Sequence, residues 1–341
     1  MTTLIIQTRY GLHAGPTPLK RDPDVWFDDG NVILVAQSAA FRVHESVLAR
    51  HSNVFKCWFS GLCTRRHSPR HGPERLDGAQ VLRLDAEATA YDLKQALSVI
   101  YGLLQVHDGA ELTFSIVAAL RRFAVDYEMF SLADASRRLL GPSFPRTLAE
   151  WDTHAQRSLP FNQGAHQAIE ALNLVWLDAW EDETDEYFPA AIYHCARLPD
   201  DVLRAGAARA DGTREALDER SARLLRHAKA QLKELGARMR ARSGELQWRI
   251  HRRCYELGCR GAFESGMIAP EGLAADELAG GNVMDRWADE VIGELEGKSR
   301  ICGECAKWAR EYHDNLREDI WKEFADFMSG PLDSRWEADC K

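Results

Sequence analysis

The sequence predicts an α+β domain, with a three-stranded sheet and flanking helices, followed by an all-α domain. Three observations carry this prediction. Short β-branched apolar runs occur only in the first part of the chain, and apolar residues beyond them recur at helical spacing. A boundary rich in glycine and proline, Gly141–Pro145, separates the two parts, and 341 residues suit two domains of ordinary size.

The composition is typical of a folded protein. Apolar residues make up 45% and charged residues 28%, with a formal net charge of −9, which excludes general disorder and argues against a nucleic-acid coat. No apolar run approaches the ~20 residues of a membrane-spanning helix, and no secretory signal is recognisable. We therefore expect an intracellular protein, cytoplasmic or nuclear, with reduced cysteines and no membrane partner.

Residues 1–21 are expected to form a flexible leader, because glycines and prolines disfavour a helix there. The first domain is expected over residues 22–140. It begins with a hairpin, formed by Asn31–Ala36 and Phe41–Val43, and Val81–Leu84 supplies the third strand. Helical spacing predicts helices within 47–59, 91–101, 114–127 and 132–140, the first interrupted at Ser52, which suits the cap of a second helix.

Beyond the boundary, residues 141–160 are expected to be a linker, 161–330 a helical domain and 331–341 a tail. Charge is unevenly distributed there: residues 214–253 contain 12 basic and 5 acidic residues, and residues 271–341 contain 9 basic and 18 acidic. Opposite charges allow the two segments to pair. Two separate solvated helix faces are the simpler interpretation.

A set of motifs follows in order between residues 22 and 140. Asp24-Val25 precedes the hairpin. The motif Phe-x-x-His-x-x-x-Leu begins in the second strand of the hairpin, and the motif Ser-x-x-Phe-x-x-x-Phe follows it. Two later helices carry the motifs Leu-x-x-Ile-Tyr and Phe-Ala-x-x-Tyr. With these motifs the segment resembles a BTB/POZ domain. The signature positions are Asp24, Phe41, His44, Leu48, Phe55, Phe59, Tyr101 and Tyr127.

The resemblance implies a protein-interaction module that self-associates or recruits partners, such as a cullin-type ubiquitin ligase scaffold or a transcriptional corepressor. It also implies that His44 is a hydrogen-bonded core residue rather than a ligand or base. The second half is similar to fungal BTB proteins in which a helical region follows the domain. The residues that carry this looser similarity are Leu198-Pro199, Asp211-Gly212-Thr213, the late Cys-x-x-Cys, and Trp321, Phe324 and Phe327.

Departures from the family pattern change two of these expectations. Cullin-binding members carry a hydrophobic-x-Glu motif where this chain has Leu62-Cys63-Thr64, so we expect weak cullin binding. Glu45 adds a second negative charge to the Asp24 pocket unless Arg42 compensates, and residues 8–21 do not supply the interface helix. Self-association is therefore not expected in the strand-exchanged mode.

Eight cysteines include two close pairs, Cys254-x4-Cys259 and Cys302-x2-Cys305. Four thiolates suit a tetrahedral, structural zinc ion, although 42 residues between the pairs is a long gap. Buried thiols without a metal are the alternative. If a site forms, the apolar residues expected to cover it are Phe263, Met284, Trp287 and Trp308, and His251 and His313 are weaker substitutes as ligands.

The sequence contains no phosphate-binding glycine loop, nucleophile elbow or His-Glu-x-x-His motif. We therefore expect a non-enzymatic interaction or adaptor protein. One alternative is a substrate adaptor of a cullin-type ubiquitin ligase, and another is a transcriptional regulator that uses the basic stretch 238–253, although nucleic acid is not an expected partner. The remaining alternative is an enzyme built on the helical half.

Overall fold

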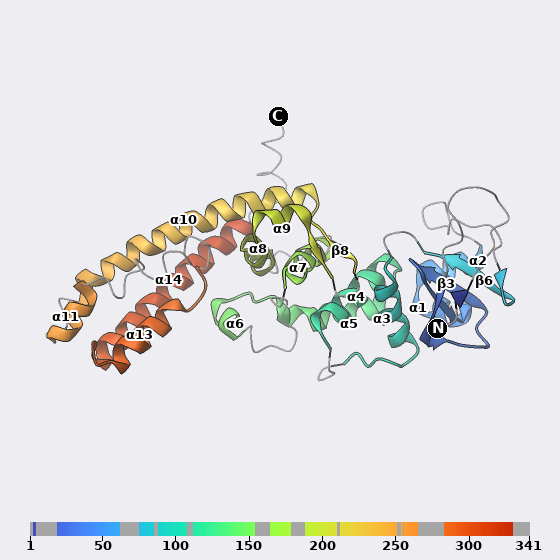
Figure 1. The fold of residues 1–341 in the computed structure, drawn as a ribbon, viewed down its shortest axis with the longest axis horizontal. Helices are drawn as coiled ribbons and strands as arrows, with labels where there is room; N and C mark the ends of the chain where they lie inside the picture. The colour runs from blue at the N-terminus through green and yellow to red at the C-terminus, as the bar shows by residue number, and fades with distance from the viewer. Residues whose placement is uncertain are drawn as a thin grey trace, which may run out of the picture. The chain divides into compact units, whose positions relative to one another are not determined.

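The chain divides into two compact units (Figure 1). Unit 1 is mainly Met1–Ser143, and unit 2 comprises Phe144–Gln156, Asn162–Ala207 and Arg214–Lys341, so the division falls inside the expected Gly/Pro boundary. The structure, a computed structural model, describes residues 3–4, 19–61, 75–84, 88–107, 112–153, 164–178, 188–209, 212–250, 254, 256–264 and 283–329. The expected tail, 331–341, lies outside these residues.

Unit 1 is built on a sheet with the strand order β1-β2-β4-β3-β6-β5. Its central hairpin pairs Val32 with Val43 and Ala36 with Ala39, with Gln37 at a φ of 52° in the turn, and β6 runs parallel to β3. The expected hairpin and third strand are thus confirmed. The strands are β1 (Thr3–Leu4), β2 (Leu19–Trp26), β3 (Val32–Ala36), β4 (Ala39–Val43), β5 (Arg75–Leu76) and β6 (Ala79–Arg83).

The expectation of three strands is wrong, because the sheet has six. The main addition is β2, which runs parallel to β4 and begins at Leu19, inside the expected leader. Its sequence, LKRDPDVW, lacks regular apolar alternation, and its Pro23 lies where the register with β4 shifts. β1 and β5 have only two residues each, which is too short for a recognisable pattern.

Three helices of unit 1 begin at capped positions. The side-chain oxygens of Ser52, Thr89 and Thr113 each accept a hydrogen bond from the backbone N–H three residues later. Ser52 thus ends one helix and starts the next, as expected. The helices are α1 (Glu45–His51), α2 (Asn53–Ser60), α3 (Ala90–Ile100), α4 (Phe114–Asp126) and α5 (Phe130–Leu140), followed by the 3₁₀ turn η1 (Gly141–Ser143).

The core of unit 1 occupies both faces of the sheet. Along β3, Val32 and Leu34 belong to the cluster that contains residues of α1–α4, whereas Ile33 and Val35 belong to a smaller cluster with Leu19. A strand buried on both faces has a continuous apolar sequence. That is the reason β3 was recognisable as a short apolar run.

Unit 2 is mostly helical. Its helices are α6 (Leu148–Thr153), α7 (Ala165–Asp178), α8 (Phe188–Ala196), α9 (Asp200–Ala205), α10 (Glu219–Ile250), α11 (Leu257–Glu264), α13 (Trp287–Gly297) and α14 (Gly303–Ser329). Two features depart from expectation. α6 lies in the segment expected to be a linker, and a short hairpin of β7 (Ala207–Ala208) and β8 (Arg214–Glu215) interrupts the helices. None of the helices in the described ranges has the length and apolarity needed to cross a membrane.

The long helices α10 and α14 lie side by side in unit 2 (Figure 1). Arg238 on α10 forms an ion pair with Glu323 on α14, and Arg242, one turn further along, pairs with Asp319, one turn back. The two helices are therefore antiparallel. Pairing of the basic segment with the acidic segment, the less simple of the two expectations, occurs at these positions.

Candidate functional site

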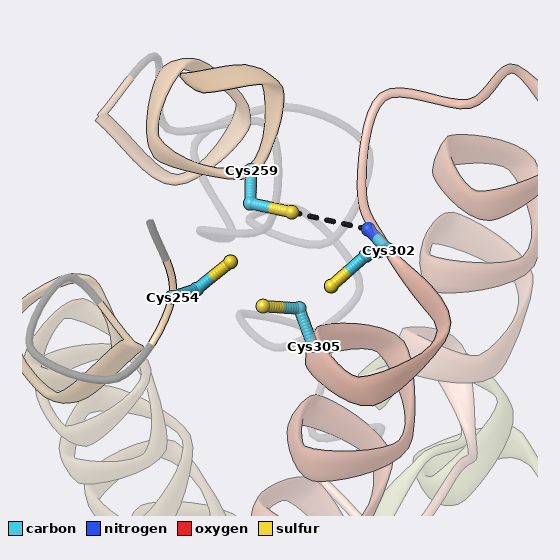
Figure 2. Close-up of side chains that lie close together, drawn as sticks. All are labelled: Cys254, Cys259, Cys302 and Cys305. Carbon is cyan, nitrogen blue, oxygen red and sulfur yellow. Dashed lines mark hydrogen bonds between the residues drawn. The ribbon is translucent and has the colours of Figure 1, made fainter. Parts of the chain in front are cut away.

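Four cysteines from separate elements of unit 2 converge on one point. Cys254 follows α10, Cys259 lies in α11, Cys302 immediately precedes α14, and Cys305 lies in the first turn of α14. Figure 2 shows all four side chains directed toward a common centre. Their sulfur atoms all lie within 4.8 Å of one another. Tetrahedral zinc–thiolate bonds of about 2.3 Å place the sulfurs roughly 3.7 Å apart, so small adjustments suffice to close the site on one ion.

Backbone N–H groups and burial give the four thiols different environments. The N–H of Cys302 donates to Sγ of Cys259 at 3.1 Å. A backbone hydrogen bond from Cys305 lowers the pKa of the Cys302 thiol, whereas burial raises the pKa of Cys259 and Cys305. Cys259 and Cys305 are buried, and Cys254 and Cys302 are half-buried.

The antiparallel register of α10 and α14 explains the convergence. The pair Arg242–Asp319 shows which positions of the two helices lie next to each other. From Arg242 the chain continues 12–17 residues to Cys254 and Cys259, and from Asp319 it goes back 14–17 residues to Cys305 and Cys302. Both cysteine pairs therefore reach the same end of the helix pair, despite the 42 residues between them.

The core around the cysteines is small. Its buried members are Cys259, Ala262, Ile292, Leu295, Ile301, Cys305, Ala306 and Ala309, with Trp308 packed against them. Of the four expected covering residues, Trp308 is therefore in place. Met284 is buried but does not belong to this core, and its backbone N–H donates to the Tyr193 hydroxyl. The side chains of Phe263 and Trp287, and all of His251, lie outside the described residues.

The remaining described cysteines have other roles. Sγ of the buried Cys195 donates to the carbonyl oxygen of Ala168 at 2.9 Å. Cys57 is disulfide-bonded, contrary to the expectation of reduced cysteines.

In unit 1, the signature residues His44 and Tyr101 are in direct contact. The Tyr101 hydroxyl accepts a hydrogen bond from the His44 N–H at 2.9 Å and lies 3.1 Å from Nδ1 of the same residue. Nε2 of His44 pairs with Asp29 at 3.2 Å, and Phe27 stacks on Tyr101. Burial raises the pKa of Tyr101. Both ring nitrogens of His44 thus have polar partners, as expected, but the side chain is 25% exposed and lies at the edge of the core rather than inside it.

The charge on Asp24 has a partner that the sequence did not suggest. Lys94 on α3 lies 2.6 Å from Asp24 and 3.0 Å from Asp22. Arg42, considered above as a compensating charge, donates instead to the carbonyl oxygen of Gly30.

Phe55, Phe59 and Tyr127 form most of an aromatic cluster. Phe55 is fully buried, stacks on Tyr127 at 5.1 Å between ring centroids, and meets Trp58 edge-on at 5.2 Å. Phe59 is half-buried at the edge of this cluster. Phe41 and Leu48 are buried in the same core. These residues hold α2 and α4 together, so their role in the structure is packing.

A surface pocket of about 380 Å³ lies in unit 1 where α1, α3 and α5 approach one another. Its apolar lining includes Ile100, Met129 and Leu132, and its polar lining includes Arg50 and Glu128. Phe130, also in the lining, is 64% exposed, which is unusual for a large apolar side chain. Phe130 was not singled out from the sequence, since one exposed phenylalanine on a helix has no pattern of its own.

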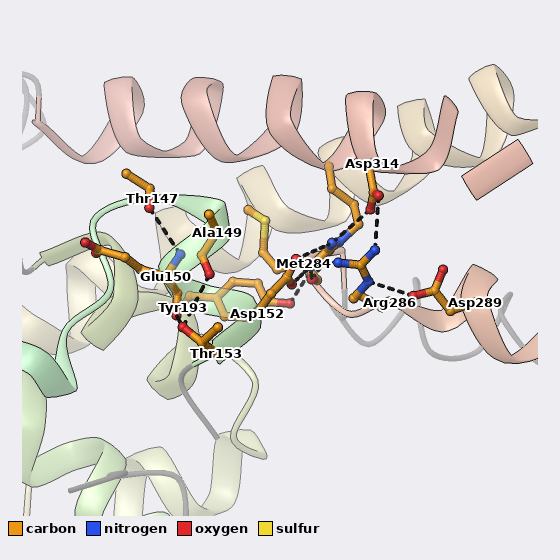
Figure 3. A network of polar contacts seen from close by, with 11 residues as sticks. Thr147, Ala149, Glu150, Asp152, Thr153, Tyr193, Met284, Arg286, Asp289 and Asp314 are labelled. Carbon is orange, nitrogen blue, oxygen red and sulfur yellow. Dashed lines mark hydrogen bonds and ion pairs between the residues drawn. The ribbon is translucent and has the colours of Figure 1, made fainter. Parts of the chain in front are cut away.

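A buried charge network connects α6 to α14 within unit 2. The fully buried Arg317 donates to the Met284 carbonyl oxygen and to both carboxylate oxygens of Asp152, and it pairs with Asp314 at 3.3 Å. Figure 3 shows Arg286 between Asp289 and Asp314 in the same network. His313, the substitute ligand, is not part of the group of four converging cysteines; it is 3% exposed, and burial lowers its pKa to about 3.

No protein-family model matches the chain, and no curated protein matches it. The site residues are therefore interpreted from their own geometry.

Proposed function

We propose that this chain is a non-enzymatic protein-interaction adaptor in which unit 1 is a BTB/POZ domain. The order hairpin, two helices, strand, three helices in unit 1 is the order that the sequence motifs imply. Contacts of His44 with Tyr101 and of Phe55 with Tyr127 give the signature residues the structural roles expected of them. These features support the proposal independently of one another.

The pocket beside Phe130 is the observation that carries the interaction function. A pocket of mixed apolar and polar lining, flanked by a largely exposed aromatic side chain, is a type of surface that can receive an anchor residue of a partner protein. Arg50 and Glu128 at the pocket supply polar groups that can orient the partner segment. We therefore assign the pocket to an apolar side chain of a partner protein.

The variant Phe130→Ser is expected to lose the proteins that associate with unit 1. The measurement is affinity purification of the full chain with quantitative mass spectrometry, comparing the wild type, Phe130→Ser and Lys20→Ser. Lys20 is exposed and lies outside the pocket lining, so its truncation is the matched control. Proteins lost with Phe130→Ser and kept with Lys20→Ser are partners of the pocket.

An unchanged set of associated proteins in Phe130→Ser would count against this assignment. If a cullin scaffold is one of the proteins that the Phe130→Ser variant no longer binds, the narrower role of a ligase adaptor is favoured. We expect binding of a cullin scaffold to be weak or absent, because this chain has Thr64 at the position where cullin-binding members have an acidic residue. Thr64 lies outside the described residues.

Transcriptional regulation through the basic stretch 238–253 is less favoured. Arg238 and Arg242, two of its arginines, form ion pairs with α14. Their charges are thereby partly neutralised, which weakens attraction to phosphate groups.

We propose further that Cys254, Cys259, Cys302 and Cys305 bind one structural zinc ion. The mutual approach of four sulfurs and the N–H donor to Cys259 suit soft, tetrahedral thiolate ligation. Four protein ligands leave no open position for substrate or water, so the ion would hold elements together rather than catalyse a reaction.

Full-length protein purified without chelator is expected to contain about one zinc per chain by elemental analysis. The double variant Cys302→Ser/Cys305→Ser is expected to contain none, because two thiolates bind far more weakly than four. Cys195→Ser removes a buried thiol outside the cluster and is expected to keep the metal. Absence of stoichiometric metal from the wild type would leave four clustered thiols as the correct interpretation, and stoichiometric iron would assign the site to another metal.

A further inference from the structure

We propose that the cysteine centre is an oxidation-sensitive clasp, in which peroxide joins Cys302 to Cys305 and thereby releases the metal. This inference rests on the proposed zinc site and concerns its regulation. It assigns different tasks to the two cysteine pairs: Cys302 and Cys305 react, while Cys254 and Cys259 only bind.

The two pairs differ in their placement. Cys302 and Cys305 bracket the start of α14 with two residues between them, so both belong to one continuous turn. Cys302 is half-buried and Cys305 buried, which gives an accessible thiol for the oxidant and a protected thiol to complete the disulfide. Cys-x-x-Cys at the start of a helix is an arrangement in which such a disulfide forms without moving the helix.

The other pair is less suited to this reaction. Cys254 lies in the link after α10, and Cys259 lies inside α11 with four residues between them. A disulfide between these two would join α11 to the link after α10 instead of lying within one continuous turn. Sγ of Cys259 also accepts a hydrogen bond from the backbone N–H of Cys302, on the opposite side of the cysteine centre.

The chemistry balances with hydrogen peroxide as the oxidant. The Cys302 thiolate attacks one peroxide oxygen, the O–O bond breaks, and hydroxide leaves, which gives a sulfenic acid on Cys302. The Cys305 thiolate then attacks that sulfur and displaces a second hydroxide, which forms the S–S bond. Two thiolates lose two electrons in total, one peroxide becomes two hydroxides, and the zinc ion is left with two thiolate ligands.

Loss of two ligands out of four releases the ion, because affinity depends on the full thiolate set. The consequence is local to this end of unit 2. α11 contributes Cys259 and Ala262 to the small core, and a bound ion would join Cys259 directly to Cys302 and Cys305. We therefore expect oxidation to detach α11 from α14.

The test uses the full chain loaded with zinc and treated with hydrogen peroxide. Zinc release is followed with a chromogenic chelator, and the disulfide is located by mass spectrometry of peptides. We expect about one zinc released per Cys302–Cys305 disulfide formed, with rebinding after a thiol reductant and zinc are added. A disulfide between Cys254 and Cys259 instead, or release without any disulfide, would overturn the proposal.

Two matched variants separate the roles of the pairs. Cys302→His and Cys254→His each keep four metal ligands, and zinc content is measured first for both. Peroxide is expected to release zinc from Cys302→His at least about tenfold more slowly than from Cys254→His, because only Cys302→His cannot form the reactive disulfide. Equal rates in the two variants would contradict the assignment.

Failure of this inference is distinguishable from failure of the zinc site. Wild-type protein without zinc before peroxide is added would refute the proposed site itself. Protein that contains zinc and retains it after peroxide treatment would refute only the clasp. If a histidine variant does not bind zinc, the location of the disulfide in the wild type decides the question.

Discussion

Replacement of Arg317 by methionine is expected to lower the free energy of unfolding of unit 2 by about 3–5 kcal/mol. Arg317 is fully buried, and its guanidinium satisfies the Met284 carbonyl oxygen as well as the Asp152 carboxylate. Methionine fills much of the same volume but donates no hydrogen bond. The Met284 carbonyl would then lose its donor in a buried setting, and the half-buried Asp152 would keep only its pair with Arg286, so the loss falls on groups with little access to water.

Unfolding in urea followed by hydrogen exchange measures this effect separately in each unit. Peptides of α14 and α6 are expected to lose protection at lower urea, while peptides of α4 in unit 1 keep the wild-type midpoint and serve as the internal reference. Arg238→Met is the control, because the exposed pair Arg238–Glu323 is worth no more than about 1 kcal/mol. Similar shifts for Arg317→Met and Arg238→Met would show that burial does not set the strength of these contacts.

Replacement of Phe55 by alanine is expected to destabilise unit 1 by about 3–5 kcal/mol. The Phe55 ring is fully buried between Tyr127 and Trp58, so its removal leaves a cavity between α2 and α4. The backbone N–H of Phe55 also donates to the Ser52 cap, and that bond survives the substitution. The loss therefore reports on packing rather than on capping.

Phe130→Ala makes the same chemical change at an exposed position and is expected to cost less than about 0.5 kcal/mol. The midpoint of urea unfolding, followed by hydrogen exchange in α4, measures both variants. A large loss of unfolding free energy for Phe130→Ala would mean that Phe130 stabilises the fold. The exposure of Phe130 would then no longer support a binding surface at the pocket.

The sequence predicts the parts of the fold that have strong local patterns. The β3–β4 hairpin and the Ser52 cap were recognisable because apolar continuity and capping chemistry are local. The strand β2 was missed because its pairing with β4 is held by backbone hydrogen bonds, while its side chains are largely polar. The helix α6 has six residues, too few for a periodic pattern.

In the candidate sites, too, only features with a local sequence pattern could be predicted. Close spacing identified both cysteine pairs, but their convergence depends on the register of α10 against α14, which the charge pattern suggested without fixing. The Arg317 network was not foreseen, because a charged residue inside a charged helix looks solvated until its partners are known. Burial of a charge is a tertiary property that no local pattern contains.

The bond between Arg317 and Asp152 joins residues that are 165 positions apart, and the bond from Trp321 to the Arg146 carbonyl spans 175. These separations determine the order in which the protein can fold during synthesis. The elements of unit 1 precede all of these contacts in the chain, so unit 1 can close while translation continues. Helix α6 is synthesised next, but it cannot form its contacts with α14 until α14 has been synthesised. Helices α8 and α10 are synthesised between the two. Unit 2 therefore completes its core late. Closing these long loops costs more entropy than forming the local contacts between α4 and α5, so we expect the folding step of unit 2 to be slower.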